Sequence, residues 1–262
     1  MSALLQAVRR GEPLGIPDVI DVHGHLGSGW SFTVPALGPD GLVATMDRLG
    51  VRTVLCSHVS CMHGDVHMGN RLLAQAMRAH PGRIAGYVVL WPGSREEVAG
   101  EVRRRLDEGF TGVKLHDANG FDYTDDAYAP ALAVAHERRL PVLLHTWGQA
   151  RQFGQVRRLA WRYPDAAIIL AHAGSRDLPG YVRLAREFAN VHLDTCYSLA
   201  PRGMVARLVA QAGPDKVLFG SDCTLLSMTQ HIGKVAGAEM PEADKVKVLS
   251  GNALRLLARI RH

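Results

Sequence analysis

Short apolar runs rich in Val, Ile and Leu recur along the chain, and longer mixed segments separate them. Nearly continuous apolar strands of this kind are typical of a parallel sheet that helices cover. We therefore predict eight β-strands, at residues 18–26, 53–58, 84–90, 112–116, 141–145, 167–172, 191–195 and 217–222.

Almost every gap between these runs has apolar residues at the three-to-four spacing of an amphipathic helix. The clearest examples are residues 71–77, 129–138, 156–163 and 204–209. Eight strand-and-helix units in a chain of 262 residues predict an α/β fold, a single (β/α)8 TIM barrel. An open doubly wound sheet is the alternative, but no glycine-rich phosphate-binding fingerprint follows the first run.

The chain shows no division into parts. No linker rich in proline or serine and no break in composition interrupts it, so we predict one barrel domain over residues 1–262. Residues 2–10 are expected to form a short helix outside the barrel. Residues 245–261, around Ser250-Gly251-Asn252, are expected to form one or two extra C-terminal helices.

Composition and charge limit the classes of binding partner that we expect. No apolar run approaches the roughly 20 residues that cross a bilayer, and the N-terminal segment lacks the charge order of a signal peptide. The net charge of +5 comes mainly from arginines on predicted helices, and no basic stretch interleaved with aromatics suggests nucleic acid. The four cysteines lack CxxC spacing, which indicates reduced thiols. We expect a cytoplasmic protein with a small-molecule substrate and no nucleic-acid or membrane partner; homo-oligomerisation stays open.

The first apolar run carries two histidines two residues apart. Side chains alternate along a strand, so Asp21, His23 and His25 are expected on one face and Val22 and Gly24 on the other. Two imidazoles on a rigid strand offer two nitrogen ligands to an ion such as zinc. On its own, such a pair is more often an ordinary polar strand end than a metal site.

Later runs end in Lys114, His116, His145, His172 and Asp222. In a barrel, the C-terminal ends of all strands meet at the catalytic face. Each residue singly has an alternative explanation, as a capped strand end or a satisfied core histidine. Several such residues on independent strands favour a metal centre, because polar groups inside a barrel mouth are costly unless paired or ligating.

Four segments together resemble the motifs of the amidohydrolase superfamily: Asp21-x-His23-x-His25, His145, Ala171-His172-Ala173-Gly174 and Gly220-Ser221-Asp222. More narrowly, the chain resembles the branch related to aminocarboxymuconate semialdehyde decarboxylase, among the amidohydrolase-related metal-dependent hydrolases. Residues 251–257 resemble the C-terminal signature of that branch. The resemblance extends from residue 19 to about residue 258.

The resemblance implies that His23, His25, His145 and Asp222 hold one divalent metal ion, with zinc as the first choice. Such an ion lowers the pKa of a bound water from 15.7 towards about 7. Asp222 and His172 are the implied catalytic residues. Asp222 would exchange a proton with the water or substrate, and His172 would act as a base or an electrostatic partner.

Two further polar residues have open roles. In other branches of the superfamily, a strand-four lysine is carboxylated and bridges two metal ions. Here Lys114 resembles the lysine of the one-metal branch, so we expect a structural or substrate-anion role. Asp21 either orients a ligand histidine or makes a plain hydrogen bond at the strand.

Substrate contacts are expected from loops that follow the strands, with Lys114 at strand four. The candidates are aromatic residues and arginines: Trp30, Trp147, Arg151, Arg176 and Tyr197. Such a set suits a planar or carboxylated substrate.

The first functional prediction is a metal-dependent hydrolase that acts on a small cyclic or acyl substrate, namely an amide, lactone or ester. The alternative is a nonoxidative metal-dependent decarboxylase of a small unsaturated or aromatic carboxylic acid. A third hypothesis is a metal-binding or small-molecule-binding protein without turnover, but binding alone does not require Asp222 and His172 beside an open metal position.

Overall fold

The computed structural model describes residues 2–29 and 38–261. Its central element is one sheet of eight parallel strands, which follow one another in chain order. The strands are β1 (Val19–Leu26), β2 (Val51–His58), β3 (Ile84–Val89), β4 (Gly112–Leu115), β5 (Pro141–Leu144), β6 (Ala167–Leu170), β7 (Val191–Asp194) and β8 (Val217–Leu218). All eight predicted strands are therefore present.

The segment after β8 closes the sheet against β1. The amide of Val22 donates to the carbonyl of Phe219 at 2.9 Å, and the amide of Asp222 donates to the carbonyl of His23 at 2.8 Å. The regular strand β8 is therefore shorter than the predicted strand 217–222, but the residues after it still lie beside β1. The predicted (β/α)8 barrel is confirmed, and its closure places Asp222 next to the histidines of β1.

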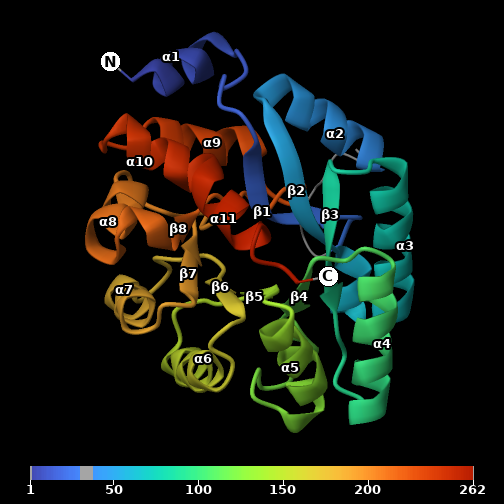
Figure 1. Cartoon of the computed structure of the whole chain (residues 1–262). Helices are drawn as coiled ribbons and strands as arrows, with labels where there is room; N and C mark the ends of the chain where they lie inside the picture. The colour runs from blue at the N-terminus through green and yellow to red at the C-terminus, as the bar shows by residue number, and fades with distance from the viewer. Residues whose placement is uncertain (1, 30–37, 262) are drawn as a thin grey trace.

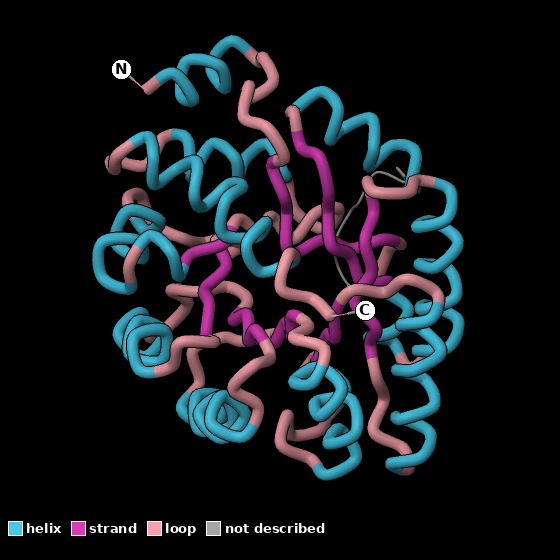
Figure 2. Tube along the Cα trace, viewed as in Figure 1, coloured by secondary structure: helices cyan, strands magenta, loops and turns pink. Residues whose placement is uncertain are grey.

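Helices surround the barrel in a ring (Figure 1), and the strands occupy its middle (Figure 2). The α-helices are α1 (Ala3–Arg10), α2 (Gly38–Leu49), α3 (Val66–Ala79), α4 (Arg95–Asp107), α5 (Ala129–Glu137), α6 (Ala150–Arg162), α7 (Leu178–Glu187), α8 (Met204–Ala212), α9 (Met228–Ala236), α10 (Glu242–Val246) and α11 (Asn252–Leu257). The short 3-10 segments are η1 (Val59–His63), η2 (Asp117–Asn119), η3 (Asp126–Tyr128) and η4 (Pro214–Lys216), and the π-helical turn η5 (Lys247–Gly251) joins α10 to α11.

Capping residues set several helix starts. The Ser94 side chain accepts from the amide of Glu97, whose carboxylate accepts from the amide of Ser94, and this capping box begins α4. The N-terminal helix predicted over residues 2–10 is confirmed as α1. The amide of Leu4 donates to Glu242 of α10 at 2.9 Å, which holds α1 against the outer helices.

The apolar core has two layers. Inside the barrel, strand side chains pack in a layer that includes Ile20, Leu55, Tyr87, Leu143, Ile169 and Leu218. Ala253 and Leu256 of α11 belong to this layer, so the predicted C-terminal helices close one end of the barrel. The second layer lies between the strands and the surrounding helices. The end of the barrel opposite α11, where the strands finish, is therefore the end that is available to polar side chains.

The side chains of β1 do not alternate as predicted. Its register against β2 shifts between Asp21 and Gly24. Asp21 lies 3.8 Å from the sulfur of Cys223, and a Cβ on Gly24 would lie 3.3 Å from the same atom. The expectation that Asp21 shares a face with His23 and His25 is wrong, because an irregularity of this kind takes one residue out of alternation.

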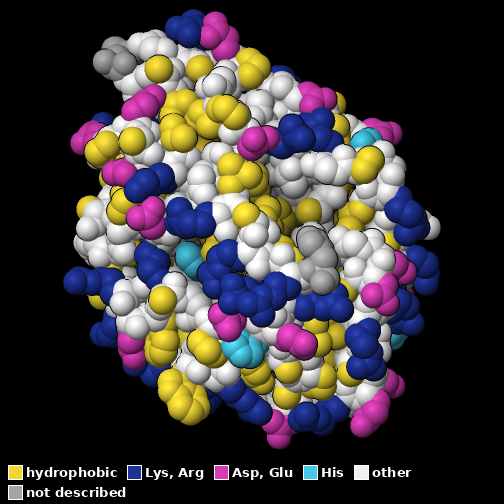
Figure 3. All heavy atoms as spheres, viewed as in Figure 1, with side chains coloured by type: hydrophobic (Ala, Val, Ile, Leu, Met, Phe, Trp, Pro, Cys, Tyr) yellow, Lys and Arg dark blue, Asp and Glu magenta, His cyan; other side chains and the backbone are white. Residues whose placement is uncertain are grey.

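The face of the molecule that carries α11 is charged. Figure 3 shows Lys and Arg side chains across this face, gathered near its middle, with acidic side chains among them. In the described part of the chain, no helix combines the length and the apolar character that a membrane span requires.

Candidate active site

Two histidines of β1 and the aspartate after β8 converge. The Nε2 atoms of His23 and His25 are 3.3 Å apart. Asp222 Oδ1 lies 3.0 Å from His25 Nε2 and 3.5 Å from His23 Nε2. All three residues are buried. The structure thus brings together three of the four predicted metal ligands.

The spacing and chemistry of this group fit a divalent ion. Donors at 2.0–2.1 Å from a tetrahedral zinc ion lie about 3.4 Å from one another, close to the observed separations. The other ring nitrogens also have partners: His23 Nδ1 lies 2.8 Å from Asp194, and His25 Nδ1 lies 3.1 Å from Ser57 Oγ. Donation from both Nδ1 atoms leaves an Nε2 lone pair on each imidazole for the ion.

Asp194 is a residue of the candidate site that the sequence analysis missed. Its Oδ2 accepts from His23 Nδ1, and its Oδ1 accepts from the backbone amides of His172 and Cys196 at 2.9 and 3.0 Å. Burial by itself raises the pKa of this carboxyl, but its hydrogen bond to His23 and the nearby imidazoles lower the pKa overall. The available signal was its position at the end of an apolar run, like Asp222.

Of the two roles predicted for Asp21, the structure shows the plain hydrogen bonds at the strand. It accepts from the backbone amides of His23 and Ser221, each at 3.0 Å, and from the Ser221 hydroxyl. These bonds join β1 to the segment after β8. Asp194, rather than Asp21, orients the His23 ring.

Lys114 projects from β4 into the same polar interior. The side chain is fully buried, and Nζ lies 3.1 Å from His23 Nε2. Burial lowers the pKa of Lys114, while nearby Asp222 opposes the change. Lys114 therefore lies beside the ligand group, and its predicted structural or anion-binding role stays a prediction.

His145 belongs to a neighbouring group. Its ring stacks on that of His116 with centroids 3.9 Å apart, and its Nε2 lies 3.8 Å from Asp117 Oδ1. The ligand atoms of His116, Asp117 and His145 form a cluster separate from that of the β1 histidines. The T-shaped contact of His145 with His172, at 4.7 Å between centroids, connects the two clusters.

His172 follows β6 in an uncommon backbone conformation. Its φ angle is 55°, and that of Asp222 is 60°, so both predicted catalytic residues occupy the left-handed region. The His172 ring stacks on Trp147 with centroids 4.5 Å apart and planes within 1°. Its Nε2 is buried and has no hydrogen-bond partner among the described residues.

Part of this polar group lines one cavity of about 210 Å³; His23, Lys114 and Asp194 are not among its lining residues. Its lining residues are His25, His116, Ala118, His145, Trp147, His172, Ser198, Asp222, Leu225 and Leu226. Burial lowers the pKa of His172 to about 4. Burial alone raises the pKa of Asp222, but the imidazoles of His23, His25 and His172 bring it well below its ordinary range. Neutral imidazoles beside an ionised carboxylate are the protonation states that bind a cation.

The predicted substrate residues lie in different places. Trp147 lines the cavity, and Tyr197 makes an edge contact with its ring at 6.3 Å between centroids. Arg151 pairs with Asp122 and its side chain is 73% exposed, and Arg176 is also exposed. Trp30 lies outside the described residues.

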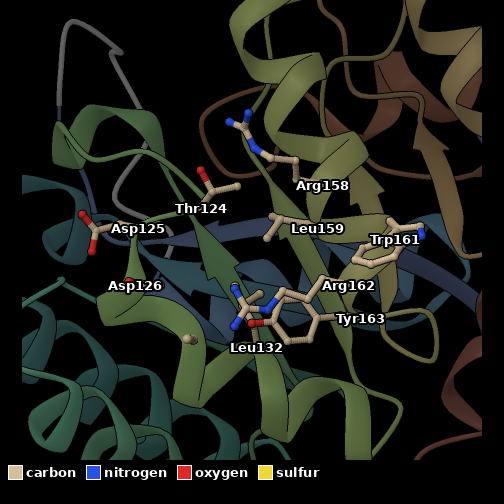
Figure 4. A pocket seen from close by; sticks show the side chains of 10 residues that line it. Thr124, Asp125, Asp126, Leu132, Arg158, Leu159, Trp161, Arg162 and Tyr163 are labelled. Carbon is tan, nitrogen blue, oxygen red and sulfur yellow. The ribbon is translucent and has the colours of Figure 1, made fainter.

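A separate hollow of about 350 Å³ lies on the flank of the barrel, between η3, α5 and α6 (Figure 4). Its lining includes Thr124, Arg158, Trp161 and Tyr163. It contains none of the predicted site residues, so the cavity at the strand ends is the candidate active site.

A model of the amidohydrolase family matches residues 20–259. The chain belongs to the amidohydrolase family. The resemblance found in the sequence is therefore confirmed, and the protein is an enzyme of this family. Comparison with curated protein sequences returned no significant match.

Several solved structures share the fold. An uncharacterized TIM-barrel protein from Bordetella bronchiseptica has a TM-score of 0.76 and 17% identity, covering 92% of this chain and 99% of that chain. For 5-carboxyvanillate decarboxylase from Sphingomonas paucimobilis, the TM-score is 0.70 with 18% identity, covering 93% and 99%. A dihydroxybenzoic acid decarboxylase from Polaromonas sp. JS666, with bound manganese and the inhibitor 2-nitroresorcinol, has a TM-score of 0.71 and 18% identity, covering 94% and 98%. Two of the three are decarboxylases, and at these identities the likeness shows that this chain shares their fold.

Proposed function

We propose that this amidohydrolase-family enzyme is a metal-dependent decarboxylase, which releases CO2 from a small aromatic or unsaturated carboxylic acid without oxidation. The supporting observation is a small cavity that has a flat aromatic wall beside a group of metal ligands. Trp147 supplies the wall, stacked on His172, and Asp222 lines the same cavity. A planar acid suits this arrangement, because its ring can lie on the wall while its oxygen atoms reach the ligand group.

The comparisons support this ranking over hydrolysis. The similar structures include enzymes named for the decarboxylation of dihydroxybenzoic acid and 5-carboxyvanillate, and both names describe aromatic acids. At 18% identity they share the fold with this chain, and the substrate class is our proposal.

The metal is proposed as one divalent ion held by His23, His25 and Asp222, with His145 as the predicted fourth ligand. A divalent ion there would supply Lewis-acid polarisation of substrate oxygen atoms. Imidazole-rich ligand sets favour zinc, whereas the Polaromonas structure contains manganese. We propose zinc as the first choice, to be tested by metal analysis of the purified protein against manganese.

The reaction needs no oxidant. The bond between the substrate and its carboxylate carbon breaks, the electron pair stays on the substrate carbon, and that carbon takes up a proton. Asp222 is the proposed carrier of this proton: because its carboxylate is ionised, it would first take the proton from water and then pass it to the substrate carbon. It lines the cavity, and one of its oxygens faces the β1 imidazoles. Trp147 and His172 orient the substrate ring against the cavity wall.

Hydrolysis of a small lactone, amide or ester is the second candidate. The observation that favours it is the position of the arginines. A decarboxylase usually holds the substrate carboxylate with an arginine, but Arg151 and Arg176 are exposed and lie outside the cavity lining. If the reaction is decarboxylation, the remaining candidate cation for the carboxylate is Lys114, which is buried beside His23 but is not itself a lining residue of the cavity.

A substrate panel tests the two candidates. The protein is stripped of metal, reloaded with zinc or manganese, and incubated with hydroxybenzoic acids, dienoic acids, lactones and amides. CO2 release and ring opening are followed separately. We expect metal-dependent CO2 release that falls by roughly 100-fold or more in Asp222→Asn. The surface variant Asp165→Asn should retain the full rate. Ring opening without CO2 release would support the second candidate instead. If neither CO2 release nor ring opening is detected, both candidates are contradicted.

A further inference from the structure

A buried thiol lies between the imidazoles of His23 and His172. Cys196 follows β7 and is fully buried. Its sulfur lies 3.0 Å from His172 Nδ1 and 3.3 Å from His23 Nδ1. The backbone amide of His172 donates to the same sulfur at 3.3 Å. The thiol therefore contacts both a predicted metal ligand and a predicted catalytic residue.

The hydrogen bonds around the thiol indicate where each proton lies. His23 Nδ1 is closer to Asp194 Oδ2, at 2.8 Å, than to the sulfur, so its proton goes to the carboxylate. Asp194 Oδ1 already accepts two backbone amides, from His172 and Cys196. The sulfur accepts the His172 amide with one lone pair. Its own proton has two acceptors within reach, the Asp194 carboxylate and His172 Nδ1 at 3.0 Å. We assign it to His172, because the two Asp194 oxygens already accept three N–H groups.

We propose that Cys196 is a positioning residue that holds His172 in the tautomer with the proton on Nε2. His172 then presents an N–H donor to the cavity, rather than the lone pair that a general base requires. Two observations agree with this assignment. Nε2 is the ring nitrogen without a partner among the described residues, and the stacked Trp147 ring fixes the plane of the imidazole.

The assignment revises the role that the sequence suggested for His172. As a donor, His172 binds a substrate oxygen, such as a carboxylate, phenol or carbonyl oxygen, and stabilises negative charge that develops there. Proton transfer then belongs to Asp222. This substrate role rests on the proposed function, whereas the tautomer itself does not.

Nitrogen NMR tests the tautomer directly. Protein labelled with 15N-histidine is recorded in long-range 1H–15N correlation spectra, without metal and with zinc, and His172 is assigned by comparison with His172→Gln. In the wild type we expect the Nε2-protonated pattern in both states. Cys196→Ser keeps a donor beside Nδ1 and should keep the pattern. Cys196→Ala removes the donor and should shift His172 to a mixture of tautomers or to Nδ1 protonation. Cys61→Ala, which removes a buried thiol elsewhere, should leave His172 unchanged.

Several outcomes separate this inference from the proposed function. A wild-type spectrum with the proton on Nδ1 overturns the inference, and so does a Cys196→Ala spectrum identical to that of the wild type. If Cys196→Ala does not fold, the wild-type and Cys196→Ser spectra decide the question. Absence of CO2 release in the substrate panel would count against the decarboxylase alone, because the tautomer is measured without substrate.

Discussion

Replacement of Asp194 by asparagine should weaken metal binding through the tautomer of His23. The asparagine carbonyl can take the place of Oδ1, where two backbone amides donate at 2.9 and 3.0 Å. Its amide group then takes the place of Oδ2, 2.8 Å from His23 Nδ1. Because an amide donates where the carboxylate accepted, His23 must accept on Nδ1 and carry its proton on Nε2. The nitrogen that faces Asp222 then no longer offers a lone pair.

The loss should be measurable in the metal dissociation constant. Removal of such a partner typically weakens metal binding about 10- to 100-fold, which corresponds to about 1.4–2.7 kcal/mol. The apo-protein would be titrated with zinc against a chromogenic chelator, and the fold would be checked by thermal unfolding followed by circular dichroism. The expected result is a weaker zinc dissociation constant for Asp194→Asn with a largely preserved spectrum.

Asp21→Asn provides a matched control. It removes another buried carboxylate that accepts two backbone amides, but Asp21 contacts the backbone of His23 and not its ring. Its zinc affinity should remain within a few-fold of the wild type. Equal zinc affinities for Asp194→Asn and Asp21→Asn would refute the reasoning, since of these two aspartates Asp194 is the one that bonds the His23 imidazole.

Three further predictions concern stability, measured by chemical denaturation. Gly69→Ala should destabilise the protein by about 1–3 kcal/mol, because the new Cβ would collide with Cys61. Gly154→Ala in α6, with nothing within 4 Å of the added carbon, should instead stabilise it by about 0.5–1 kcal/mol; a loss there would contradict the helix geometry. Burial lowers the pKa of His192 to about 3, so the unfolded chain binds its proton first as the pH falls below about 6.5. Between these two pH values, titration of His192 should lower the free energy of unfolding by about 1.4 kcal/mol for each pH unit of acidification. His192→Gln should remove this part of the pH dependence; a variant whose unfolding free energy changes with pH as steeply as that of the wild type would exclude the contribution.

The sequence predicted the barrel because hydrophobic periodicity depends on which side chains are buried, and each strand carries its own signal. It also predicted three residues that converge at the candidate site, since strand ends meet in any closed barrel. The partner of His23 was not predictable in the same way. Asp21 and Asp194 both lie in apolar runs, and the choice between them depends on an irregular register in β1.

The sequence also could not predict in which direction side chains point in the segments that follow the strands. Arg151 was predicted to contact the substrate because it follows strand five, but it lies at the exposed side of α6 and pairs with Asp122. His145 was predicted with the β1 histidines, and the structure stacks its ring on that of His116 at the end of β5. The direction of Arg151 is set by the segment that follows β5, which no hydrophobic pattern records.

The left-handed backbone at His172 and Asp222 has a consequence for mutational scanning of this enzyme. At φ angles of 55° and 60°, glycine and asparagine are tolerated, whereas β-branched residues are strongly disfavoured. An inactive valine or threonine variant at either position would therefore combine a distorted main chain with the missing functional group, and the two effects could not be separated. In a saturation library, the glycine and asparagine variants are the ones whose activity can be interpreted as chemistry.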